Sequence, residues 1–156
     1  MPKVDIYIET DNGSRKKMYR GYGAVVEFKK KNGEKETREV YGTCYGTWNL
    51  AYILAVTDAL GILTKPCEAV LHAADRFVCE SLCSGRAQEW QSDGWHTKKG
   101  EPVVNAEEWK ELLRAAKPHR ISFACTKQSP YSSGLHAGIS RIKQKGEHWQ
   151  QMSVMP

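Results

Sequence analysis

The chain has 156 residues, 40% of them apolar, which suits one domain with a single hydrophobic core and is short for two. No apolar run approaches the roughly 20 residues that span a bilayer, and Met1 leads into a strand pattern instead of a signal peptide, so we expect a soluble, cytoplasmic protein without membrane partners. The net charge of +5 is modest for a nucleic-acid-binding protein, so the distribution of the basic residues is more informative than their sum.

Three strands open the chain. Apolar and polar residues alternate over 4–9, the period-2 pattern of a strand with two different faces. Two further strand patterns, over 21–28 and 37–45, flank Asn32-Gly33, a dipeptide typical of tight hairpin turns. The pattern predicts that these two strands are antiparallel neighbours.

Helices alternate with short strands in the rest of the chain. Helical spacing of apolar residues predicts a helix over 47–63, with Thr47 or Asn49 as its N-cap. The elements predicted after it are a buried strand over 69–73, a helix over 75–82 ending around Gly85, a helix beginning at Asn105 with Glu108 completing a capping box, a strand over 120–125, and a weaker helix over 134–145. This order predicts an α/β fold with a five-stranded mixed sheet packed by helices.

The segment from Trp90 to Trp109 is a long basic excursion that contains several aromatic residues and leads into a helix. Lys98 and Lys99 lie at its centre, between Trp95 and the helix. Aromatic residues in a long excursion more often build its small core than stack on a ligand, so we expect Trp90 and Trp95 to brace it. The two lysines are candidates for contacts with phosphates.

This excursion, the motif Gly21-Tyr-Gly-Ala24 and the segment Thr47-Trp-Asn49 together resemble type 1 ribonucleases H, in their order and at about their spacing. The resemblance covers residues 3–142. It implies a ribonuclease H-like domain, which we place at 1–146, followed by a flexible tail over 147–156. The family cleaves the RNA strand of RNA/DNA hybrids with magnesium ions held by four carboxylates.

Only one of these carboxylates has a clear counterpart. The resemblance places Glu9 at the family's first aspartate, with Asp11 as an alternative ligand if the strand bulges. The glutamate of the first helix falls on Tyr52, whose phenol is a poor magnesium ligand. The aspartate after the next strand falls on Ala74, with Asp75 one residue later.

The last part of the chain supplies no replacement. Residues 131–145 contain no Asp or Glu, and His136 is the one plausible substitute for the fourth carboxylate. The mobile catalytic histidine of the family has no counterpart in 126–130. Cys79 and Cys83 are one helical turn apart, but no further ligands follow at metal-binding spacing.

The residues that would contact nucleic acid are better retained. Asn49 matches a family position that contacts the minor groove of the hybrid, and Arg76 matches a polar position beside it. The predicted nucleic-acid-binding residues are therefore Asn49, Arg76, Trp95, Lys98 and Lys99.

Three hypotheses follow. The first is a module that binds RNA/DNA hybrid or double-stranded RNA, with catalysis lost or strongly impaired and no resident cofactor. The second is an atypical ribonuclease H that uses Mg²⁺ or Mn²⁺ through Glu9, Asp11 and Asp75, with Glu9 and Asp75 as its catalytic carboxylates, or one that uses a different metal through His136. The third is a protein-interaction domain that reuses the fold, with an unidentified protein partner.

Overall fold

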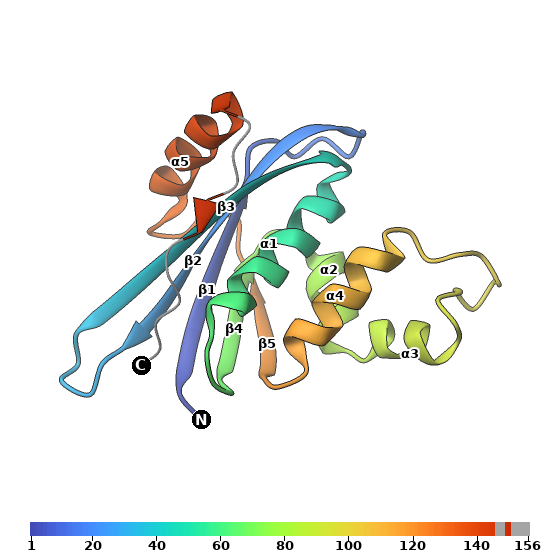
Figure 1. The fold of residues 1–156 in the computed structure, drawn as a ribbon, viewed down its shortest axis with the longest axis horizontal. Helices are drawn as coiled ribbons and strands as arrows, with labels where there is room; N and C mark the ends of the chain where they lie inside the picture. Colours follow the sequence, from blue (N-terminus) through green and yellow to red (C-terminus); the bar gives the residue numbers. More distant parts are fainter. Residues whose placement is uncertain (146–148, 151–156) are drawn as a thin grey trace.

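The protein is described by a computed structural model over residues 1–145 and 149–150. A mixed sheet with strand order β5-β4-β1-β2-β3-β6 forms its centre (Figure 1). The strands are β1 (Lys3–Thr10), β2 (Met18–Lys29), β3 (Lys35–Gly46), β4 (Glu68–Ala73), β5 (Arg120–Cys125) and β6 (Trp149–Gln150). β2 pairs antiparallel with β1 and β3, whereas β4 pairs parallel with β1 and β5.

The predicted five-stranded α/β architecture is therefore confirmed. The two-residue β6 adds a sixth strand beside β3 and lies within the segment predicted as a tail. Residues 147–148 and 151–156 of that tail lie outside the described residues, so the boundary at 146 and the flexibility of the tail stay predictions.

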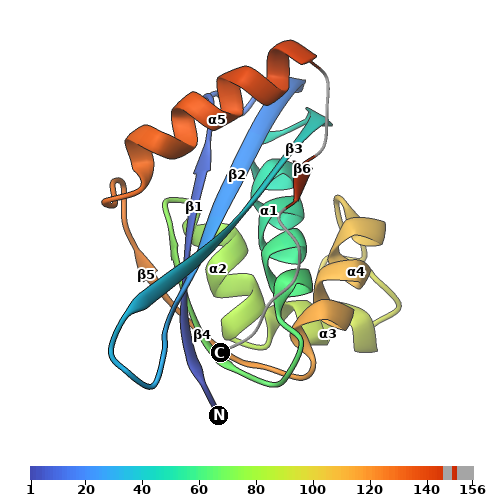
Figure 2. The same ribbon diagram turned by 60° about the vertical axis from the view of Figure 1, so that its left-hand side comes forward.

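Helices of the described residues lie on both sides of the sheet (Figures 1 and 2). They are α1 (Trp48–Ile62), α2 (Arg76–Cys83), α3 (Arg86–Ser92), α4 (Ala106–Ala116) and α5 (Ser132–Lys145). α1 and α2 pack on one face of the sheet and enclose the main core together with α3 and α4, whereas α5 packs on the opposite face. In the part of the chain that the structure describes, no helix is both long enough and apolar enough to cross a membrane.

Alternation along the strands produces two cores. Even-numbered residues of β1 and β2, such as Ile6 and Ala24, pack under α1 in the larger core. The smaller core joins α5 to the other face and consists of Val25, Tyr41, Leu135, Ile139 and Ile142. The smaller core fixes the position of α5 on the sheet. Because α5 begins near the end of β1, this position determines which α5 side chains contact that strand.

Two local predictions were wrong. The sequence did not predict α3, a short polar helix that starts directly after Gly85, whose φ of 91° turns the chain. The capping box at Asn105 does not form either: Asn105 precedes α4 in the left-handed conformation, with φ 62°, and its side chain makes no capping hydrogen bond. An N-cap side chain normally reaches the helix from extended backbone, so this conformation removes the motif.

Candidate functional site

The four positions at which the resemblance requires carboxylates meet at one edge of the sheet. Glu9 lies near the end of β1, Tyr52 in the second turn of α1, Ala74 just after β4, and His136 in α5. Hydrogen bonds link the Tyr52 phenol to the Thr10 side chain and to the Ala74 backbone. His136 Nε2 lies 3.1 Å from Glu9 Oε1. The structure therefore joins Glu9 to His136 directly and Tyr52 to the Ala74 backbone, and the charge of Glu9 acts on the Tyr52 phenol.

Glu9 is held by α5 through both carboxylate oxygens. Besides the contact of Oε1 with His136, its Oε2 accepts a hydrogen bond of 2.6 Å from Ser132 Oγ. The side chain is only 14% exposed. Two partners on one helix therefore occupy the carboxylate that was the best-supported candidate for catalysis and metal binding.

Tyr52 is buried at the centre of the site. Burial raises the pKa of its phenol above the usual value of 10, and the negative charge of Glu9 raises it further. The phenol therefore stays neutral at physiological pH and is a weak ligand for a hard cation. The Trp48 ring packs edge-on against Tyr52 at 5.1 Å, and Trp48 Nε1 donates to Thr10 Oγ1 at 3.2 Å.

Asp75 serves as the N-cap of α2. Its Oδ1 accepts a hydrogen bond of 3.1 Å from the Val78 backbone N–H, and the residue is 1% exposed. Oδ2 has no hydrogen-bond partner within the described residues. Burial raises the pKa of this carboxyl, while the backbone N–H groups and the nearby Arg15 guanidinium oppose the rise.

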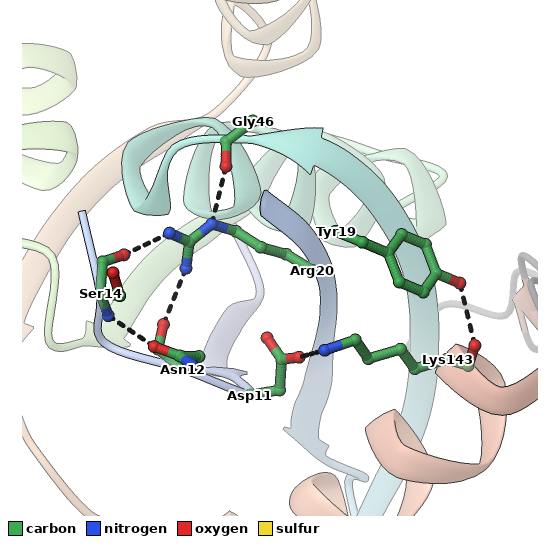
Figure 3. Close-up of polar contacts among 7 residues, drawn as sticks. All are labelled: Asp11, Asn12, Ser14, Tyr19, Arg20, Gly46 and Lys143. Carbon is green, nitrogen blue, oxygen red and sulfur yellow. Dashed lines mark hydrogen bonds and ion pairs between the residues drawn. The ribbon is translucent and has the colours of Figure 1, made fainter. Parts of the chain in front are cut away.

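Asp11 belongs to the connection between β1 and β2, residues 11–17, which we call the strap (Figure 3). Lys143 of α5 pairs with its Oδ2. Arg20, fully buried in β2, anchors the strap by donating to the backbone carbonyls of Asn12, Ser14 and Lys16, and its Nε donates to Gly46 O at 2.8 Å. One guanidinium thus joins the strap to the end of β3.

These donors do not fit a magnesium ion. Within the described residues, no group of three or more His, Cys, Asp or Glu side chains is arranged to hold a metal. Magnesium requires several oxygen ligands in near-octahedral geometry. Each of the three candidate carboxylates instead lies near a basic side chain: His136 for Glu9, Lys143 for Asp11 and Arg15 for Asp75.

The two predicted binding residues beside this site come from the starts of α1 and α2. Asn49 lies in the first turn of α1, half-buried, and its Oδ1 has no hydrogen-bond partner within the described residues. Arg76 opens α2 and is exposed, with Nε 2.7 Å from Glu80 Oε1. Arg15 of the strap lies 5.1 Å from the centre of the Trp48 ring. We call the surface formed by Arg15, Trp48, Asn49 and Arg76 the rim.

The basic excursion is a compact hairpin. The Val103 N–H donates to Trp95 O, and the Thr97 N–H donates to Glu101 O, which places Lys98 and Lys99 at the exposed tip. Trp95 is half-buried against the main core. Trp90 also packs there, edge-on to Trp109 at 5.4 Å. The tryptophans therefore brace the excursion, and its lysines point away from the core.

Sequence reasoning missed two residues of the site. Ser132 was omitted because it lies 123 positions from Glu9, and a serine at the start of a helix is an ordinary N-terminal residue. Arg15 was not among the predicted site residues, because it matches none of the motifs that carry the resemblance. The absence of acidic residues from 131–145 was the available signal that Glu9 has basic and hydroxyl partners there.

Comparison with known proteins gives consistent matches. The family model described as RNase H matches residues 3–128. A protein of Bradyrhizobium sp. strain ORS 278 named Ribonuclease H is 34% identical over 103 residues, which is 66% of this chain and 64% of that protein. The chain thus spans somewhat less than two thirds of that relative's length.

Solved structures show the same fold at lower identity. LC9-RNase H1, described as a type 1 RNase H with the type 2 active-site motif, matches 94% of this chain and 74% of its own length, with a TM-score of 0.77 and 18% identity. The foamy viral protease-reverse transcriptase in complex with RNA/DNA hybrid matches 93% of this chain and 20% of its own, with a TM-score of 0.62 and 18% identity.

Proposed function

The chain belongs to the RNase H family, and we propose that it binds RNA/DNA hybrid or double-stranded RNA as a module in which magnesium-dependent cleavage has been lost. The observation that carries this proposal is the set of internal partners around the surviving carboxylates. Phosphodiester hydrolysis by two metal ions needs carboxylates that are free to hold those ions. Here Glu9 is engaged by His136 and Ser132, and Asp11 by Lys143.

The electrostatics of the rim support binding without a metal. In an active member of such a family, the ions offset the negative charge of both the carboxylates and the nucleic acid. Arg15, Lys143 and His136 supply positive charge or proton donors at this edge of the sheet instead. A phosphate backbone can therefore approach the rim without an added cation.

The hybrid would contact two regions of the protein. Arg76 at the rim presents an exposed guanidinium suited to sugars and phosphates, and the half-buried Asn49 beside it offers the NH₂ of its amide to minor-groove edges, since its Oδ1 is buried. Lys98 and Lys99 at the tip of the excursion are suited to the phosphates of the other strand, with Trp95 holding the hairpin in place. Recognition of this kind reads the shape of the duplex more than its sequence.

A second candidate function is weak hydrolysis by an atypical site. Asp75 Oδ2 favours it, because this oxygen is buried and has no hydrogen-bond partner within the described residues. Both Asp75 and Glu9 act electrostatically on Tyr52, so the two carboxylates lie around the same phenol. Mg²⁺ or Mn²⁺ would then need Glu9 to leave His136 and Ser132.

The test is a gel assay of the purified full chain with a labelled RNA/DNA hybrid, in magnesium, in manganese and in chelator, reading mobility shift and cleavage together. We expect a shift in all three conditions and cleavage in none. Metal-dependent cleavage that Glu9→Gln abolishes, and that the exposed control Glu34→Gln leaves intact, would establish the atypical nuclease. Absence of both signals would favour the protein-interaction hypothesis.

A further inference from the structure

An aromatic and basic surface lies next to the rim, at the end of the β2–β3 ladder. Tyr19 and Tyr45 are direct cross-strand partners there. Tyr19 is 40% exposed and Tyr45 71% exposed. Two large rings side by side, Tyr45 mostly exposed and Tyr19 partly covered by α5, are suited to a ligand with flat faces.

α5 and the strap hold Tyr19 in place (Figure 3). Its hydroxyl donates to Lys143 O at 2.9 Å, and Lys143 Nζ lies 5.5 Å from the centre of its ring. The same Lys143 pairs with Asp11 of the strap. Tyr19 is therefore a rigid platform, whereas Tyr45 beside it projects further into solvent.

The charge around the two rings is positive. Four exposed basic residues come from the strap and from the last turn and a half of α5: Lys16, Lys17, Arg141 and Lys145. The segments 12–20, 43–46 and 141–145 contain no Asp or Glu. Of the acidic residues nearby, Asp11 is paired with Lys143, and Glu39 acts on Tyr41 together with Arg141. This combination favours a polyanion with aromatic groups over an apolar or cationic partner.

We propose that Tyr19 and Tyr45, with Lys16, Lys17, Arg141 and Lys145, form a binding site for single-stranded nucleic acid that extends from a duplex held at the rim. Bases within a duplex are stacked on one another, whereas unpaired bases offer free faces to aromatic side chains. Only Gly46 and Thr47 separate Tyr45 from Trp48 and Asn49, and Arg15 on the strap contacts Trp48. The surface thus continues the proposed duplex interface.

The inference rests on the proposed nucleic-acid binding and names its ligand more closely. The test measures binding to the full chain in chelator by fluorescence anisotropy. The ligands are a blunt RNA/DNA hybrid, the same hybrid with a short thymidine overhang at either end of either strand, and a thymidine oligonucleotide alone. We expect one overhang polarity to bind more tightly than the blunt hybrid.

Tyr45→Ala should abolish that gain, about 5- to 100-fold in Kd for one stacked base, and leave the Kd of the blunt hybrid unchanged. Tyr45→Phe, which keeps the ring, should retain the gain. Lys16→Ala with Lys17→Ala should weaken overhang binding more than the matched pair Lys30→Ala with Lys31→Ala in the distant β2–β3 turn. Thermal melts of each variant exclude unfolding as the cause.

The outcomes separate the two proposals. Binding of the blunt hybrid with no gain from any overhang, or a gain that Tyr45→Ala preserves, would overturn this inference and leave the proposed function standing. Binding of the thymidine oligonucleotide that Tyr45→Ala abolishes, with no binding of the blunt hybrid, would overturn the duplex-binding proposal and support the single-strand site.

Discussion

Single residues determine the chemical groups present at the candidate site, where β1 and β4 end. The resemblance aligns Tyr52 and Ala74 with two of the family's carboxylates, and the partners of Glu9 come from a helix far along the chain. Arg20 has a structural role: it is fully buried, and its guanidinium donates hydrogen bonds to backbone carbonyls of the strap and of Gly46. A buried ionised group of this kind is stable only while its hydrogen bonds are complete.

Arg20→Met should therefore destabilise the protein by about 3 kcal/mol or more, because it removes the donor for the buried Gly46 carbonyl and for three part-buried carbonyls of the strap. The free energy of unfolding from urea titration measures this loss. The matched control is Arg114→Met on the surface of α4, where the arginine is 71% exposed and the change should stay within about 0.5 kcal/mol. Equal effects of the two substitutions would contradict the anchoring role of Arg20.

Asp75 predicts a dependence of stability on pH. Because burial raises the pKa of this carboxyl above its usual 3.8, folding favours its protonated form. Its contribution to stability is present below the usual pKa and is lost as the pH rises through the raised pKa. Asp75→Asn keeps a capping oxygen and removes the charge.

Relative to Asp75→Asn, the wild-type protein should thus lose stability as the pH rises from about 3 to about 7. Urea titrations of both proteins across this range give the difference in unfolding free energy at each pH. The exposed Asp93→Asn serves as the control and should show no such trend. A difference that grows in favour of the wild-type protein with rising pH would contradict the assigned cause.

At the scale of elements, the docking of α5 determines the geometry of the site. This helix carries Ser132 and His136, which hold Glu9, and Lys143, which holds Asp11. Its close approach to β3 depends on Gly138, since a Cβ there would overlap the buried ring of Tyr41. The close packing of α5 on β3 therefore depends on the small residue Gly138 as well as on the apolar side chains of the helix.

Gly138→Ala should cost roughly 1–3 kcal/mol of unfolding free energy, because the added methyl group overpacks the contact with Tyr41. Gly134→Ala is the matched control on the same helix: its Cβ meets no atom within 4 Å, and it should stabilise by about 0.5–1 kcal/mol through helix propensity. Denaturant titrations measure both. Opposite signs support the seating role, and a stabilising Gly138→Ala would refute it.

At the scale of the whole molecule, the proposed duplex interface joins the rim to the excursion, two regions carried by different elements around the main core (Figure 1). The basic residues of this interface lie in separate segments of the sequence, so the net charge of +5 does not by itself reveal a basic surface. Such an interface should show binding that depends strongly on salt.

Lys98→Ala with Lys99→Ala should weaken hybrid binding and reduce the slope of log K against log salt by nearly two, at about 0.9 per lost phosphate contact. Anisotropy titrations over a series of salt concentrations measure the slope. Lys30→Ala with Lys31→Ala, in the β2–β3 turn, should leave it unchanged. An unaltered slope in the Lys98 and Lys99 variant would remove the excursion from the interface.

The sequence by itself determined the order of the main elements, because the alternation over 4–9, the Asn32-Gly33 turn and the helical spacing after Thr47 are local signals. The sequence also supplied the hypothesis of which residues align with the family's carboxylate positions, because motif matching needs only residue identities. It did not predict α3, whose polar residues lack a periodic pattern, nor the left-handed backbone of Asn105.

Only the tertiary structure decided the roles of the carboxylates. Asp75 became a buried helix cap, Glu9 met Ser132 and His136, and Asp11 met Lys143, pairings that span up to 132 positions of the chain. The cross-strand pair of exposed tyrosines likewise emerged only from the register of β2 and β3. The physical reason is that contacts between distant side chains depend on how α5 packs on the sheet and how strands align, which no local pattern of residues encodes.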